Sequence, residues 1–87
     1  METKINIDER EAKIIVLLNN LKPQDKNAYV IAAKTDIGYG TAYNLMRVLK
    51  EKGALDMVKS TSLRKTIFNA TAEGLEEALR ILEQKKE

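Results

Sequence analysis

Apolar residues recur at helical spacing near the start of the chain, and a capping signal precedes them. Asp8 followed by Glu11 is typical of a capping box, which predicts a helix that runs to about Asn20. Ile15 and Val16 widen its apolar surface, so this helix needs more than one packing partner. These two residues predict either that the helix forms a subunit interface or that the other helices of the fold pack over both of its apolar sides. The main apolar face carries Ile14, Leu17, Leu18 and Leu21.

A second helix is predicted over residues 26–34, after a connection that contains the only proline of the chain. A short turn over residues 35–38 follows it. We expect Gly38 to take a positive φ there, because tight corners between helices often need one. The residues expected to face inward from this helix are Val30, Ile31 and Ala33.

A third helix begins near Gly40 or Thr41 and ends at Lys52, because Gly53 is well suited to the C′ position beyond a helix end. Its apolar positions fall on one stripe, so the opposite side is predicted to face solvent. The stripe consists of Ala42, Leu45, Met46 and Leu49.

The spacing then changes from helical to alternating. Residues 54–60 and 64–70 are rich in Val, Ile, Phe and Thr, and a short polar loop over 61–63 separates them. Two such runs predict a β-hairpin. A last helix is predicted over 72–84, with Thr71 as its N-cap and Glu73 favourable in its first turn. Its apolar face carries Leu75, Ala78, Leu79 and Leu82, and Ile81 lies well off that face.

The order helix, helix, turn, helix, hairpin, helix predicts an α+β, mostly helical fold. A single winged helix-turn-helix domain over residues 1–87 accounts for every segment. A domain of 87 residues buries a small core, and dimerisation is a common remedy. We therefore expect a homodimer in which the first and last helices supply the contacts. The candidate interface residues are Ile15, Val16, Leu75, Leu79, Ile81 and Leu82.

The composition removes several function classes. The chain has 0 His and 0 Cys, so the commonest general base, the commonest metal ligand and any thiolate site are missing. We expect no enzyme, no catalytic residue, no metal and no cofactor. The longest apolar run covers only residues 14–18, and the start lacks the order of a signal peptide. A cytoplasmic, nucleoid-associated protein is expected.

Charge is unevenly distributed along the chain. Residues 34–65 carry seven basic and three acidic side chains, whereas residues 1–33 carry five of each and residues 66–87 carry three basic and five acidic. A basic centre is typical of a surface that faces an anion such as nucleic acid. On charge alone, lysines scattered over a soluble protein remain an equal alternative.

The third helix has the residues of a DNA-reading helix. In a helix-turn-helix, the second helix of the motif enters the major groove, which is about 12 Å wide. Asn44 suits an adenine edge, and Arg47 suits guanine or a phosphate. Amides near Gly40 could hold a phosphate. The alternative is an ordinary solvated face, with Tyr43 packed on the preceding helix. The outward set is Thr41, Tyr43, Asn44, Arg47 and Lys50.

The predicted hairpin ends in a compact basic and polar loop. Such a wing can lie along the DNA backbone or enter an A/T-rich minor groove. A solvated turn is the alternative, since turns are usually polar. The loop and its flanks comprise Lys59, Ser60, Thr61, Ser62, Arg64 and Lys65.

Residues 39–53 resemble the recognition-helix segment of PadR-type winged-helix regulators. That segment starts with Tyr-Gly-Thr-x-Tyr, continues as a leucine-rich run and ends in Gly. Residues 64–74 are similar to their Arg-x-x-Tyr-x-Leu-Thr-x-x-Gly stretch, and the resemblance covers about residues 26–80. It implies a DNA-binding dimer and adds Tyr39 to the DNA site. The departures are Asn44 where the family often has proline, and Phe68 and Ala70 in place of Tyr and Leu.

PadR-type proteins often continue into a long C-terminal helical region for dimerisation and effector binding, whereas this sequence has one helix after the hairpin. We therefore expect sequence-specific binding of double-stranded DNA at a palindromic site, in the role of a transcriptional repressor. Two alternatives stay open. One is a DNA-organising or plasmid-segregation protein that spreads along DNA, and the other is a winged-helix module for protein–protein interaction.

Overall fold

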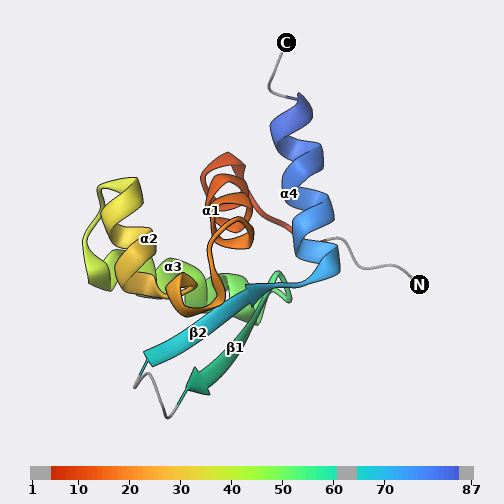
Figure 1. Ribbon diagram of the computed structural model, residues 1–87. Coiled ribbons are helices and arrows are strands. Elements are labelled where there is room, and N and C mark those ends of the chain that lie inside the picture. Colours follow the sequence, from red (N-terminus) through yellow and green to blue (C-terminus); the bar gives the residue numbers. More distant parts are fainter. Residues whose placement is uncertain (1–4, 61–64, 85–87) are drawn as a thin grey trace.

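The computed structural model describes residues 5–60 and 65–84. Over this part of the chain, helices surround a small core and an antiparallel hairpin projects from one side (Figure 1). The strands pair from Leu55 opposite Ala70 to Ser60 opposite Lys65. The predicted order of elements is confirmed. The elements are α1 (Glu9–Asn19), η1 (Pro23–Asp25), α2 (Ala28–Thr35), α3 (Tyr39–Glu51), β1 (Leu55–Ser60), β2 (Lys65–Ala70) and α4 (Ala72–Gln84).

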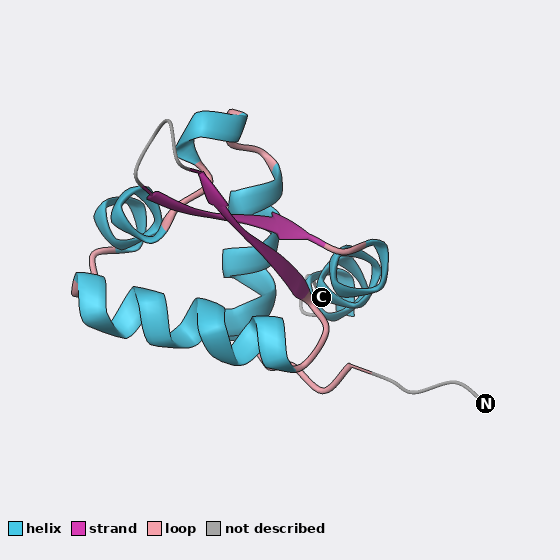
Figure 2. Cartoon of the chain, turned by 90° about the horizontal axis from the view of Figure 1, so that it is seen from below, coloured by secondary structure: helices cyan, strands magenta, loops and turns pink. Residues whose placement is uncertain are grey.

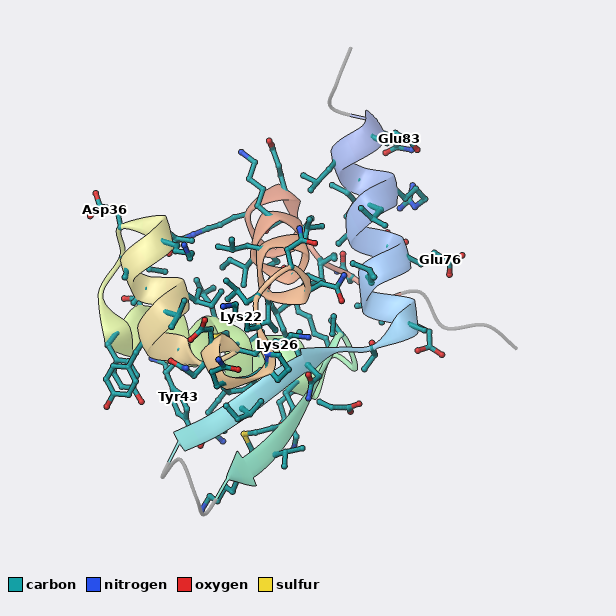
Figure 3. All side chains as sticks on the ribbon, in the orientation of Figure 1. Lys22, Lys26, Asp36, Tyr43, Glu76 and Glu83 are labelled. Atoms are coloured by element: carbon teal, nitrogen blue, oxygen red, sulfur yellow. The ribbon has the colours of Figure 1, made fainter. Side chains whose placement is uncertain are left out.

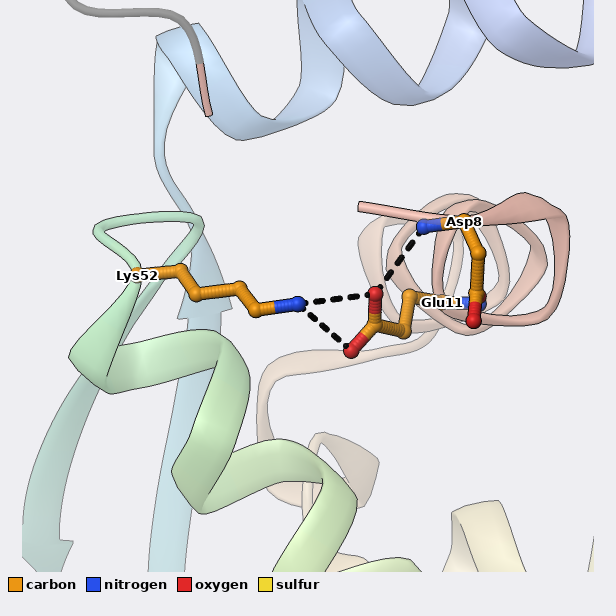
Figure 4. Close-up of polar contacts among 3 residues, drawn as sticks. All are labelled: Asp8, Glu11 and Lys52. Carbon is orange, nitrogen blue, oxygen red and sulfur yellow. Dashed lines mark hydrogen bonds and ion pairs between the residues drawn. The ribbon is translucent and has the colours of Figure 1, made fainter. Parts of the chain in front are cut away.

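The predicted capping box at the start of α1 is present, and its glutamate also pairs with Lys52, the C-cap residue of α3. The Glu11 amide donates to Asp8 Oδ1 at 2.8 Å, and the Asp8 amide donates to Glu11 Oε1 at 2.9 Å. Lys52 Nζ lies 3.1 Å from both carboxylate oxygens of Glu11, which is buried (Figure 4). This ion pair joins the start of α1 to the end of α3.

Two predictions for α2 and its turn are wrong. Ala33 is exposed, and the buried residues of this helix are Ala28, Ile31 and Ala32, which share one side at i, i+3 and i+4 spacing. Ala33 is turned away from that side. The positive φ of 60° belongs to Asp36, whereas Gly38 has a φ of −66° and is the extended N-cap residue of α3. Aspartate tolerates the left-handed region because its short polar side chain bonds locally.

The end of α3 matches the prediction for Gly53, which has a φ of 86°. Its amide donates to the Lys50 carbonyl at 3.0 Å, and the Ala54 amide donates to the Leu49 carbonyl at 2.9 Å. These two bonds form a Schellman motif, which ends the helix and turns the chain into β1.

The start of α4 is fastened to that same turn. Thr71 is its N-cap, as predicted, because Thr71 Oγ1 accepts from the Gly74 amide at 2.9 Å. The same hydroxyl lies 2.8 Å from the Gly53 carbonyl oxygen, to which it donates, and the Thr71 amide donates to the Ala54 carbonyl at 3.0 Å. Gly74 packs directly on the Ala54 backbone. The turn that follows α3 and the start of α4 are therefore held together.

The core lies around α1, with α2 and α4 at opposite ends of the molecule in both ribbon views (Figures 1 and 2). The hairpin is anchored to this core. The Phe68 side chain is fully buried, and its amide donates to the Lys26 carbonyl at 2.8 Å. This bond fixes β2 against the connection between α1 and α2. The largest side chains buried with Phe68 are Ile15, Leu18, Ile31, Met46, Leu49 and Leu55.

Much of the apolar surface that the sequence assigned to a dimer interface is buried within the single chain. Helices α1 and α4 pack against each other within one chain, and Ile15 is 0% exposed in the core of that chain. It has no surface left for a second copy, so its assignment to the interface is wrong. Leu79 on α4 is 50% exposed. The other candidates are half-buried against the core, namely Val16, Leu75, Ile81 and Leu82.

Candidate nucleic-acid interface

Helix α3 has one buried side and one exposed side. Ala42, Met46 and Leu49 are fully buried, as the apolar stripe predicted, and Leu45 is half-buried against the core. This packing holds the helix axis in place and turns the opposite side to solvent. The exposed side carries Gly40, Thr41, Asn44, Arg47, Val48, Lys50 and Glu51.

Four of these residues line a shallow, open depression, namely Asn44, Arg47, Val48 and Glu51. Within the residues that the structure describes, Arg47 has no ion-pair partner, so its guanidinium is available to a ligand. Val48 is 45% exposed and Glu51 is exposed. The sequence reasoning missed both. Their spacing of four and seven residues from Asn44 was the available signal, since it places all three on one side of the helix.

A ladder of aromatic rings joins α2, α3 and the hairpin. The Tyr29 and Tyr39 rings stack with centroids 4.2 Å apart and planes at 21°, and the Tyr39 and Tyr43 centroids are 6.0 Å apart at 22°. Tyr43 meets Phe68 of β2 edge to face at 6.1 Å. Figure 3 shows Tyr43 beside the hairpin. We call these four residues the tyrosine ladder.

This packing changes what is expected of each tyrosine at the proposed DNA site. Tyr43 is half-buried, and its packing is against Tyr39 and Phe68, whereas Tyr39 is 43% exposed. Tyr29 is 59% exposed and was missed, because nothing in the pattern of α2 shows that its ring reaches α3. Burial raises the pKa of the Tyr39 phenol above 10.0, and the neighbouring Tyr29 and Tyr43 raise it further. At neutral pH this phenol is uncharged and can donate a hydrogen bond.

The first turn of α3 lacks a side-chain cap. Its N-cap residue is Gly38, which makes no side-chain hydrogen bond to the helix. The first amides of a helix have no partner inside it, and they carry partial positive charge. Gly40 and Thr41 are exposed in this turn. The arrangement leaves backbone donors beside the hydroxyl of Thr41, as the sequence predicted for a phosphate contact.

The hairpin extends from the same side of the molecule as Tyr43 (Figure 3). Lys59 is exposed on β1. Ser60 and Lys65 are the last paired residues of the two strands. The remaining predicted wing residues, Thr61, Ser62 and Arg64, lie outside the described residues. On α4, by contrast, Glu76 and Glu83 project away from Tyr43 and the hairpin. These two acidic side chains of α4 therefore lie away from Tyr43 and the hairpin, whereas Glu51 is exposed on α3 itself.

Among the residues that the structure describes, no helix is long and apolar enough to cross a membrane. The same residues include no cluster of three His, Cys, Asp or Glu side chains that could hold a metal ion.

Comparison with known proteins identifies the fold. No family model and no curated protein match the chain. A single-residue mutant of ZitR from Lactococcus lactis has a TM-score of 0.74 at 19% identity, covering 95% of this chain and 56% of its own. MepR from S. aureus, in a complex with DNA, has a TM-score of 0.73 at 17% identity, covering 90% and 58%. The chain spans just over half the length of each, and its fold is that of the winged helix-turn-helix proteins.

Proposed function

We propose that this protein binds double-stranded DNA through α3 and the hairpin, and that it acts as a transcriptional repressor. The observation that carries the proposal is the exposed side of α3, where Asn44 and Arg47 line a shallow depression together with Val48 and Glu51. The similarity to MepR, a protein with the same fold that was solved in complex with DNA, supports it. Membership of the PadR type remains a prediction.

In the proposed complex, α3 lies in the major groove and its exposed side reads base edges. Asn44 pairs with adenine through its amide, and Arg47 pairs with guanine O6 and N7. Val48 supplies an apolar contact for a thymine methyl group. These three side chains share the depression on α3, so neighbouring base pairs would meet them together.

The remaining candidates serve the sugar–phosphate backbone, which sets the position of the protein on DNA. Thr41, Tyr39 and Tyr43 offer hydroxyls, the Gly40 amide offers a backbone donor, and Lys50 offers charge. The hairpin lies on the adjacent backbone or minor groove, where cations gain from the narrow A/T-rich groove. Its proposed contacts are Lys59, Ser60, Thr61, Ser62, Arg64 and Lys65.

The binding proposal is tested by a gel shift on bulk duplex DNA at low salt. A DNA-binding protein has non-specific affinity under these conditions, because cationic side chains release counterions from the backbone. Absence of any shift would favour a winged-helix module for protein–protein interaction. Footprinting then separates a repressor, which protects one site, from a protein that organises DNA by spreading along it.

We expect Arg47→Ala to weaken binding to a site selected from random duplex DNA by roughly tenfold or more. The loss should be smaller on a scrambled duplex, because Arg47 is proposed to read a base. Fluorescence anisotropy with both duplexes measures the two losses. Arg80→Ala is the matched control, since Arg80 lies on α4 and pairs with Glu77. An equal loss on both duplexes would reassign Arg47 to a phosphate.

We propose that α4 supplies the contact between two copies, through Leu79 and the half-buried apolar residues beside it. A dimer at micromolar concentration is expected in light scattering, and Leu79→Glu should shift it toward the monomer. Glu83→Gln on the same helix is the control. A twofold dimer then implies a palindromic site with half-sites about 34 Å apart. A monomer for the unaltered protein would remove this interface.

A further inference from the structure

We propose that Tyr29 on α2, stacked on Tyr39, forms a contact for the sugar–phosphate backbone of duplex DNA. This proposal rests on the proposed function and adds a second helix to the interface. It starts from exposure, since the Tyr29 side chain is the most exposed large hydrophobic residue among those described, at 59%. Its ring is nevertheless held, because it lies 4.2 Å from the Tyr39 ring in a stack.

The ladder lies on the side of α3 that faces the hairpin. Tyr43 is in contact with Phe68 of β2, and Tyr39 precedes Tyr43 by about one helical turn on the same side. If α3 occupies the major groove and the hairpin the adjacent minor groove, one sugar–phosphate strand passes between them. The ladder borders that passage, and Tyr29 extends it beyond the start of α3.

The chemistry of the pair suits a phosphate strand. A phenol hydroxyl donates to a phosphate oxygen, and the ring packs on the deoxyribose, as tyrosines do in protein–DNA contacts. Stacking holds two large side chains in a fixed orientation before DNA arrives, so less conformational freedom is lost on binding. The Tyr39 phenol is protonated at neutral pH, as an ordinary tyrosine is, so its hydroxyl can donate. Lys50, about two turns beyond Tyr43, supplies a cation for the same strand.

A neutral contact and a cationic contact differ in their response to salt, and this difference defines the test. We expect Tyr29→Ala to weaken binding roughly tenfold, and to the same extent on a selected duplex and on a scrambled one. The slope of affinity against salt should stay unchanged. Lys50→Ala is the comparison variant, since losing one phosphate contact by a cation lowers that slope by about 1.

Tyr29→Phe keeps the ring stack and removes only the hydroxyl, so it isolates the hydrogen bond from any change in packing. We expect an intermediate loss, about threefold. The three tyrosines of the chain all belong to the ladder, and there are 0 Trp, so intrinsic tyrosine fluorescence reports on it directly. Adding duplex DNA should change this fluorescence, and less so in Tyr29→Phe. Far-UV circular dichroism checks that each variant is folded.

The outcomes separate the two proposals. Wild-type affinity in both Tyr29 variants, with clear DNA binding by the unaltered protein, would overturn the contact and leave the proposed function in place. No DNA binding by the unaltered protein would overturn both, and the stacked pair would then be a surface for another protein. A loss confined to the selected duplex would also overturn the proposal, because it would make Tyr29 a reader of bases.

Discussion

Gly74→Ala is expected to destabilise the protein by about 3 kcal/mol, which lowers the melting temperature by on the order of 15 °C for a domain of this size. A Cβ at Gly74 would lie 2.7 Å from Ala54 Cα and 2.9 Å from its carbonyl carbon, and closer still to its carbonyl oxygen. These are backbone atoms, so no side chain can rotate away. The start of α4 would have to move off the turn that follows α3.

Gly40→Ala is the matched control for this experiment. Gly40 is also in the first turn of a helix, but a Cβ there would meet nothing within 4 Å. Alanine has the higher helix propensity, so this variant should keep its stability or gain up to about 1 kcal/mol. Thermal and urea unfolding measure both variants. Equal stability of Gly74→Ala and the unaltered protein would show that α4 does not approach Ala54 this closely.

Lys52→Met is expected to cost about 3 kcal/mol, because it leaves the Glu11 carboxylate buried without its counter-charge. Glu11 is 7% exposed, and the bond from the Asp8 amide would be its one remaining hydrogen bond among those described. Glu11→Gln should cost less than about 1 kcal/mol. The amide keeps the bond from Asp8, and Lys52, whose side chain is 33% exposed, can turn to water.

The double variant Lys52→Met with Glu11→Gln should recover most of the loss, since no buried charge remains. Lys13→Met is the control, because Lys13 pairs with Glu9 at 3.4 Å on the exposed side of α1. An exposed pair of this kind contributes at most about 0.5 kcal/mol. Urea unfolding gives all four values. Equal costs for Lys52→Met and Glu11→Gln would contradict a buried carboxylate at Glu11.

Both variants concern the C-terminal end of α3, the helix that the proposed function places in the major groove. The Lys52–Glu11 pair fixes the end of this helix to α1, and the bond from the Thr71 hydroxyl to the Gly53 carbonyl fixes it to α4. Its first turn is held by α2, through the short linker and the stack of Tyr29 on Tyr39. A helix fixed at both ends presents its reading side with little loss of freedom on binding, which favours affinity.

Local patterns in the sequence determined the elements of this protein and their order. The caps at Asp8 and Thr71, the stop at Gly53 and the apolar stripe of α3 were predicted because each depends on residues within a few positions along the chain. The exposure of Asn44 and Arg47 followed from the same stripe. The candidate residues for reading DNA could therefore be named before any tertiary contact was known.

Only the tertiary structure decided which distant residues meet. The burial of Ile15, the partner of Lys52, the close approach of Gly74 to Ala54 and the stack of Tyr29 on Tyr39 all join separate elements. Periodicity shows which side of a helix is apolar, but it does not show which neighbour covers that side. The sequence therefore determined the α3 surface of the proposed interface, and packing determined that Tyr29 of α2 borders it.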